Sequence, residues 1–124
     1  MGRSDLEITL EQIGQVTVMK LAGPVDSANF AKFKRELAAA CMGGRVRVVA
    51  DCSELTYMNS KGFGVLTMHH RSQLSGKGEL VICGLNRKLV KTMDLLGLGE
   101  ILRMFPTIEE ALGALKTHSG SVSE

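Results

Sequence analysis

The stretch that decides the fold is residues 46–66, VRVVADCSELTYMNSKGFGVL, in which a strand is followed by a turn and a helix. Apolar residues alternate along residues 46–52, as in a strand that is covered on both faces. Polar residues at positions 51–54 indicate a turn. Asn59 and Ser60 then mark a helix start, because their side-chain oxygens can accept hydrogen bonds from free backbone N–H groups. The stretch therefore predicts a serine hydroxyl at the mouth of a helix, near the surface.

Composition and charge exclude several classes of protein. The chain has 124 residues, of which 44% are hydrophobic and 23% charged, as expected for one globular domain. A net charge of +2 and the absence of Trp argue against nucleic-acid binding. No apolar run is long enough for a membrane span or a signal peptide, so we expect a cytoplasmic protein with no membrane contact. Its three cysteines, Cys41, Cys52 and Cys83, favour a reducing compartment and a role as small core residues.

The N-terminal part predicts a hairpin followed by a helix. Alternating apolar residues lie on both sides of Gly14-Gln15, which suits a two-residue turn between antiparallel strands. Gly23-Pro24 is expected to end the second strand. Asp26 and Ser27 offer caps for an amphipathic helix that ends at Gly43-Gly44. The apolar face of this helix is formed by Phe30, Phe33, Leu37 and Ala40.

The rest of the chain predicts further strands and helices in alternation. They are a helix from Ser60 to about Ser75 ended by Gly76-Lys77-Gly78, a strand over residues 80–83, a helix over 89–96 closed by Gly97, a strand over 101–105, and a last helix with Thr107 and Glu110 as its capping box. From about Thr117 the tail is rich in Ser and Gly and should be frayed. The order β-β-α-β-α-β-α-β-α predicts a single α/β domain, residues 5–117, with helices packed on a mixed sheet. Residues 118–124 are expected to form a disordered tail.

Ser60 could serve as a nucleophile, a phosphate acceptor or a plain helix cap. A nucleophilic serine needs a base, but His69 and His70 lie more than two helical turns away, at ~5.4 Å per turn, and His118 is in the tail. The chain also lacks a G-x-S-x-G elbow. A phosphate would add roughly −1.5 to −2 charges, which a helix N-terminus tolerates and Lys61 could assist. The residues alone leave open whether Ser60 is a switch or only a cap.

The helix after Ser60 carries a second signal. Phe63 and Leu66 fall on one side, whereas Met68 lies ~160° from Leu66 and should face outward. An exposed Met near a switchable serine suits an adaptable partner surface, but a single exposed Met is also ordinary on a protein surface. Gly62 and Gly64 are costly in a helix, so we expect them to allow close packing against the sheet or a partner.

Several of these motifs together resemble the STAS domain of bacterial anti-anti-sigma factors. The resemblance is carried by Asp51-Cys-Ser53-Glu-Leu55, which precedes Met58-Asn-Ser-Lys-Gly-Phe-Gly-Val-Leu66. Further similar segments extend along most of the chain: residues 21–26, 80–85, 95–98 and 105–111. The chain departs from the family where many members have Asp before the acceptor serine and Ser or Thr after it, because Asn59 and Lys61 stand there.

The resemblance implies a partner-switching mechanism. An unphosphorylated STAS protein binds an anti-sigma factor that is also a serine kinase, and so frees the sigma factor. The kinase phosphorylates the serine that matches Ser60, the complex dissociates, and a PP2C-type phosphatase resets the switch. On this reading the chain is not an enzyme, uses no cofactor or metal, and is a monomer or weak homodimer. The expected partner-binding residues are Asp26, Ser53, Asn59, Ser60, Lys61, Gly62, Phe63 and Met68.

Two other readings stay open. STAS domains also serve as scaffolds of stress-signalling complexes or as subunits of lipid-transport ABC systems, where Ser60 would be only a cap. A small enzyme using Ser60 or Cys41 is the third reading, since Cys41 and Arg47 match the C-x5-R spacing of thiolate phosphatases, although in the wrong local context. His69-His70 lacks a further metal ligand, and Gly76-Lys-Gly78 lacks the spacing of a P-loop. A small basic patch, Arg87, Lys88 and Lys91, is expected to be a solvated helix face.

Overall fold

The observed order of elements confirms the predicted β-β-α-β-α-β-α-β-α arrangement. A computed structural model describes residues 5–42, 46–76 and 78–122, with side chains described as far as residue 115. The elements are β1 (Glu7–Ile13), β2 (Val16–Val25), α1 (Phe30–Ala40), β3 (Arg47–Met58), α2 (Ser60–Ser75), β4 (Glu79–Cys83), α3 (Arg87–Leu95), β5 (Met104–Phe105) and α4 (Ile108–Val122).

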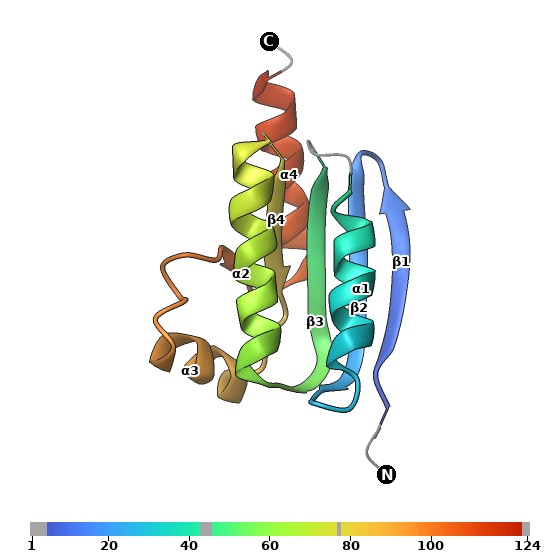
Figure 1. Cartoon of the computed structure of the whole chain (residues 1–124). Coiled ribbons are helices and arrows are strands. Elements are labelled where there is room, and N and C mark those ends of the chain that lie inside the picture. Colours follow the sequence, from blue (N-terminus) through green and yellow to red (C-terminus); the bar gives the residue numbers. More distant parts are fainter. Residues whose placement is uncertain (1–4, 43–45, 77, 123–124) are drawn as a thin grey trace.

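The five strands form one mixed sheet in the order β1-β2-β3-β4-β5 (Figure 1). β1 is antiparallel to β2, and Gly14 adopts the left-handed conformation, φ 60°, that the tight turn between them requires. All later neighbours are parallel, which confirms the predicted topology. The carboxyl ends of β2 to β5 therefore lie at one edge of the sheet, and α1 to α4 begin there.

Helices cover both faces of the sheet, as Figure 1 shows, with α1 and α2 on one face and α4 on the other. Phe33 and Phe63, which are fully buried, belong to the α1 and α2 side, and Leu115 belongs to the α4 side. β3 supplies the two layers alternately: Val48 packs in the first core and Val49 in the second. A strand covered on both faces is thus confirmed for the start of the central stretch.

The predicted turn at residues 51–54 is wrong, because β3 continues through it to Met58. Between Lys20 and Ala22 of β2, the register shows that β3 carries one residue more than its partner, and a second extra residue follows opposite Gly23 and Pro24. Such bulges shift the side-chain alternation. Beyond residue 51, the buried residues of β3 are therefore Cys52, Leu55 and Met58, at a spacing of three instead of two.

Three further boundaries differ from expectation. Gly23-Pro24 does not end β2, which runs to Val25, because the second bulge accommodates Pro24 beside β3. The fifth strand is only Met104–Phe105, and residues 101–102 lie in a turn because their backbone bonds back to Leu98. α1 begins at Phe30, later than a cap at Asp26 or Ser27 implies.

The ends of two helices also bear on the predictions. Gly43-Gly44, the expected end of α1, lies outside the described residues, and α1 itself ends at Ala40. α4 extends to Val122, beyond the expected fraying near Thr117, and Thr107 Oγ1 accepts a hydrogen bond from Glu110 N at 3.1 Å, as the capping box predicts. The proposed domain bounds, residues 5–117, stay a prediction.

Candidate functional site at the start of α2

The start of α2 is fixed by one asparagine. Asn59 is the N-cap residue, with extended backbone, and its side-chain oxygen accepts the Gly62 N–H at 2.8 Å. Its own N–H donates to Val25 O at 3.0 Å, which ties the end of β3 to the end of β2. The helix start is thus anchored to the edge where the parallel strands end.

Ser60 is the first residue of α2, and its side chain is exposed. Within the described part of the chain, no residue forms a hydrogen bond with its hydroxyl. The capping role that the sequence allowed for Ser60 is therefore filled by Asn59. Ser60 presents a free hydroxyl beside the unpaired N–H groups of a helix N-terminus, a position that favours an anion.

The next three residues divide between surface and core. Lys61 is exposed, whereas Gly62 is buried and Phe63 is fully buried under the helix. A Cβ on Gly62 would lie 2.6 Å from Met58 Cγ and 3.3 Å from Val25 Cγ1, so the expected close packing against the sheet is present. Lys61 can contact a partner directly, but Phe63 can act only by holding the helix in place.

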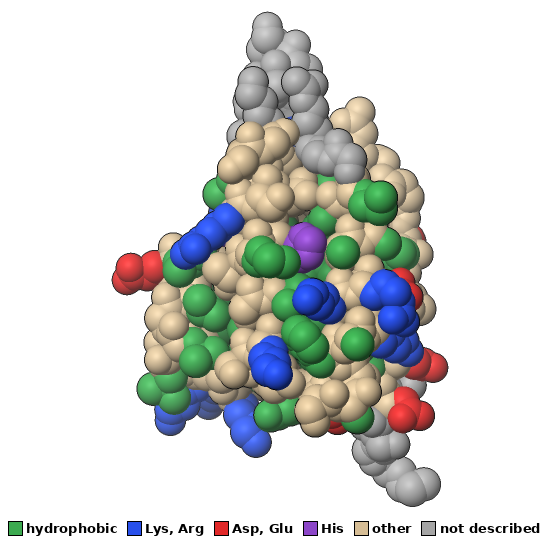
Figure 2. Space-filling view, in the orientation of Figure 1, with side chains coloured by type: hydrophobic (Ala, Val, Ile, Leu, Met, Phe, Trp, Pro, Cys, Tyr) green, Lys and Arg blue, Asp and Glu red, His purple; other side chains and the backbone are tan. Residues whose placement is uncertain are grey.

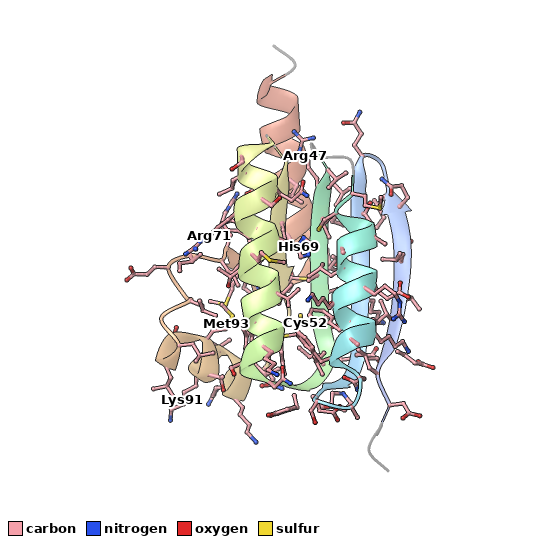
Figure 3. The ribbon with its side chains drawn as sticks, in the orientation of Figure 1. Arg47, Cys52, His69, Arg71, Lys91 and Met93 are labelled. Carbon is pink, nitrogen blue, oxygen red and sulfur yellow. The ribbon has the colours of Figure 1, made fainter. Side chains whose placement is uncertain are left out.

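An exposed stripe continues along α2 from Lys61. A Cβ on exposed Gly64 would meet nothing within 4 Å, so the packing against the sheet expected for both glycines is wrong for Gly64. Met68 is 51% exposed, as its helical position predicts. Arg71 follows on the same stripe and was not among the residues predicted from the sequence. Its helical spacing from Lys61, Gly64 and Met68 places it on the same face of α2 and could have identified it. Lys and Arg side chains alternate with hydrophobic ones on this face of the molecule (Figure 2), and Arg71 points away from the α1 side of α2 (Figure 3).

The structure brings Asp26 to this site but leaves Ser53 apart. Asp26 follows Val25, the hydrogen-bond partner of Asn59, and its carboxylate accepts the N–H groups of Ala28 and Asn29 at 3.0 and 3.2 Å. It therefore shapes the loop before α1. Ser53 lies about 16 Å of extended strand before the end of β3, at ~3.3 Å per residue. It packs instead beside Gly84, the residue after β4.

The residues considered for catalysis are not arranged for it. His70 is buried with Nδ1 3.2 Å from Leu80 O, and burial lowers the pKa of His69, which lies on the side of α2 that faces α1 (Figure 3). Burial raises the pKa of the Cys41 thiol to about 11, which opposes a reactive thiolate, and Arg47 enters a strand. Among the described residues no group of three or more His, Cys, Asp or Glu side chains could hold a metal ion. The side chain of His118 lies outside the described part.

In the described residues no helix combines the length and apolar character needed to cross a bilayer.

Comparisons with known proteins place this geometry in a family. Residues 7–111 match the STAS domain. The putative anti-sigma factor antagonist BtrV of Bordetella bronchiseptica is 31% identical over 112 residues, which span 90% of this chain and 97% of that protein. An anti-sigma factor antagonist from Mycobacterium paratuberculosis shares the fold, with a TM-score of 0.82 at 18% identity over 90% of this chain and 95% of the other.

A third similar structure is the Bacillus cell fate determinant SpoIIAA in its phosphorylated form, with a TM-score of 0.67 at 22% identity over 88% of this chain and 99% of the other. The two structural matches show the shared fold. The family match covers the strand, the bulged segment and the α2 start that carry the resemblance in the sequence. The chain therefore belongs to the STAS domain family, and relatives of it carry the name anti-sigma factor antagonist.

Proposed function

We propose that this protein is an anti-sigma factor antagonist controlled by phosphorylation of Ser60. Its unphosphorylated form binds an anti-sigma factor serine kinase and frees the sigma factor; phosphorylation of Ser60 releases the complex, and a PP2C-type phosphatase restores it. The observation that carries the proposal is the free, exposed hydroxyl of Ser60 at the first position of α2, next to a cap that Asn59 provides.

The position suits a modification that changes binding without unfolding the helix. A phosphate adds roughly −1.5 to −2 charges, and a helix N-terminus favours such an anion. In a closed interface the same charge would lack a partner, at a cost of about 2–5 kcal/mol, and about 1.4 kcal/mol is already tenfold in affinity. Phosphorylation should therefore weaken the complex by at least about 30-fold.

The proposed docking surface consists of Asp26, Asn59, Ser60, Lys61 and Met68. Asp26 and Asn59 order the loop and the cap, and Lys61 and Met68 offer contacts along the exposed stripe. Gly62 and Phe63 support this surface from beneath, and Ser53 would reach only a partner that extends toward Gly84. The names of the relatives support the role, as does SpoIIAA, which has a phosphorylated form. The proposal places the protein in the cytoplasm, without cofactor, as a monomer or weak homodimer.

A pull-down from lysate of the native host tests the proposal, with wild type, Ser60→Ala and Ser60→Glu as baits. Ser75→Glu is the matched control, because it adds the same charge to an exposed serine at the other end of α2, ~22 Å away along the helix axis. We expect wild type, Ser60→Ala and Ser75→Glu to retain a kinase-like anti-sigma protein identified by mass spectrometry, and Ser60→Glu to lose it.

Equal capture of that protein by all four baits would contradict a switch at Ser60. A stable complex with a scaffold protein or a membrane ATPase that forms equally well with every bait would favour a role as a stress-complex scaffold or a transporter subunit. The folding of each bait is checked by circular dichroism, so that loss of binding is not mistaken for loss of structure.

A further inference from the structure

A second, separate hollow lies at the carboxyl edge of the sheet. A pocket of about 300 Å³, partly open to solvent, lies between β4, β5 and the start of α3. Its walls include Cys83, Leu85, Val90, Met104 and Phe105, all of them apolar or uncharged side chains. None of these residues belongs to the surface around Ser60, so the cavity is independent of the proposed switch.

The chemistry of the lining selects against ions. Among the residues that the structure describes, no charged side chain lines the pocket. Cys83 is the titratable side chain in the lining, and its thiol donates to Asp51 Oδ1 at 3.8 Å. Burial raises the pKa of this thiol to about 12. The thiol therefore stays neutral at physiological pH. A carboxylate or ammonium placed against these walls would lose part of its water without gaining a partner among the lining side chains.

The size and position of the cavity favour a small molecule. An engineered apolar cavity of about 150 Å³ holds benzene, so about twice that volume suits two fused rings. The volume is also within the range of ligand sites, roughly 300–1,000 Å³, and is far too small for a partner helix. The pocket adjoins the carboxyl ends of β4 and β5.

We propose that the cavity between β4, β5 and α3 binds a neutral, compact apolar molecule about the size of two fused rings. Val90 provides the α3 wall and Leu85 the wall from the loop after β4, and Phe105 lies across from them on β5. The bound rings would bridge α3 to the edge of the sheet.

Indole is a suitable probe because it is neutral and bicyclic. The full chain, labelled with nitrogen-15, is titrated with indole and followed by NMR. We expect saturable shifts that are concentrated at the backbone amides of Leu85, Val90 and Phe105. Val90→Trp should fill the cavity and weaken indole binding at least tenfold. Lys91→Trp is the matched control, since it adds the same ring to an exposed side chain of α3 that points away from the sheet (Figure 3), and it should bind indole as wild type does.

Leu85→Trp fills the pocket from the loop after β4 and keeps the test valid if Val90→Trp does not fold. Shifts that do not saturate, or that spread over the surface, would overturn the proposal. So would wild-type affinity in a folded Val90→Trp or Leu85→Trp protein. Shifts of the same amides on dilution without indole would assign the cavity to a second copy of the chain and overturn the small-molecule site.

Discussion

Replacing Gly64 by alanine should stabilise the protein, whereas replacing Gly62 by alanine should not, although both lie near the start of α2. A Cβ on Gly64 meets no atom within 4 Å. A Cβ on Gly62 would lie 2.6 Å from Met58 Cγ, inside a buried contact between α2 and the sheet. The two positions lie in the same helix but differ in the space around them.

The expected magnitudes follow from two terms. Alanine is favoured over glycine in a helix interior by about 1 kcal/mol, and this gain applies to both variants. Overpacking of a filled core costs about 1–3 kcal/mol, and it applies only to Gly62→Ala. Gly64→Ala should thus be about 1 kcal/mol more stable than wild type, and Gly62→Ala should be less stable than Gly64→Ala by about 1–3 kcal/mol.

Equilibrium unfolding in urea measures both free energies, and equal m-values would show that the unfolding transition itself is unchanged. Because the helix term is common to the two variants, the difference between them isolates the packing of Gly62 against Met58. If Gly62→Ala proved as stable as Gly64→Ala, the close packing of α2 on β3 would not be the reason why residue 62 is a glycine.

Three further results are expected. Asn59→Ala should lower the free energy of unfolding, measured in urea, by about 1 kcal/mol because the α2 cap is lost. Asn86→Ala removes the equivalent 2.8 Å cap hydrogen bond of α3 and should lower it by a similar amount. An unchanged free energy of unfolding in either variant would contradict the capping assignment. Arg103→Ala should lower the free energy of unfolding by about 1–2 kcal/mol, because Glu79 is left buried without its ion pair, and adding Glu79→Gln should recover part of that stability. A lack of coupling between the two substitutions in a double-mutant cycle would argue against the ion pair. Burial raises the pKa of Cys41 from 9.0 to about 11, so its thiol should react with Ellman's reagent at pH 8 about 100-fold more slowly in the native than in the unfolded chain. The contribution of Cys41 to stability should also fall as the pH rises above about 9. Mass spectrometry of the labelled peptide measures the two rates, and equal rates would refute the burial.

The sequence predicted the elements well where a local signal determines them. Alternation, a Gly-X turn and capping residues are properties of neighbouring residues, so the hairpin at Gly14 and the helix Ser60–Ser75 could be located. The outward position of Met68 likewise follows from helical geometry alone.

The bulges of β3 could not be predicted from that local pattern. Whether residues 51–54 form a turn or a strand depends on the register with β2, which is separated from them in the sequence. A spacing of three between Cys52, Leu55 and Met58 also resembles a helix more than a strand, so the apolar pattern was misleading. The apolar cavity beside α3 is equally non-local, because its walls come together only when β4 and β5 pair.

The division of roles between Asn59 and Ser60 is the physical basis of the switch proposed for this site. If Ser60 were the cap, a modification of its hydroxyl would remove the hydrogen bond that starts α2 and cost about 1 kcal/mol of stability. Because Asn59 makes that bond, a charge on Ser60 leaves it in place, and the helix dipole favours the charge by about 0.3–1 kcal/mol. Ser60→Glu should therefore change binding without lowering stability, whereas Asn59→Ala should lower stability but leave the hydroxyl of Ser60 in place. A structural cap would couple the two properties in one residue, and a switch separates them.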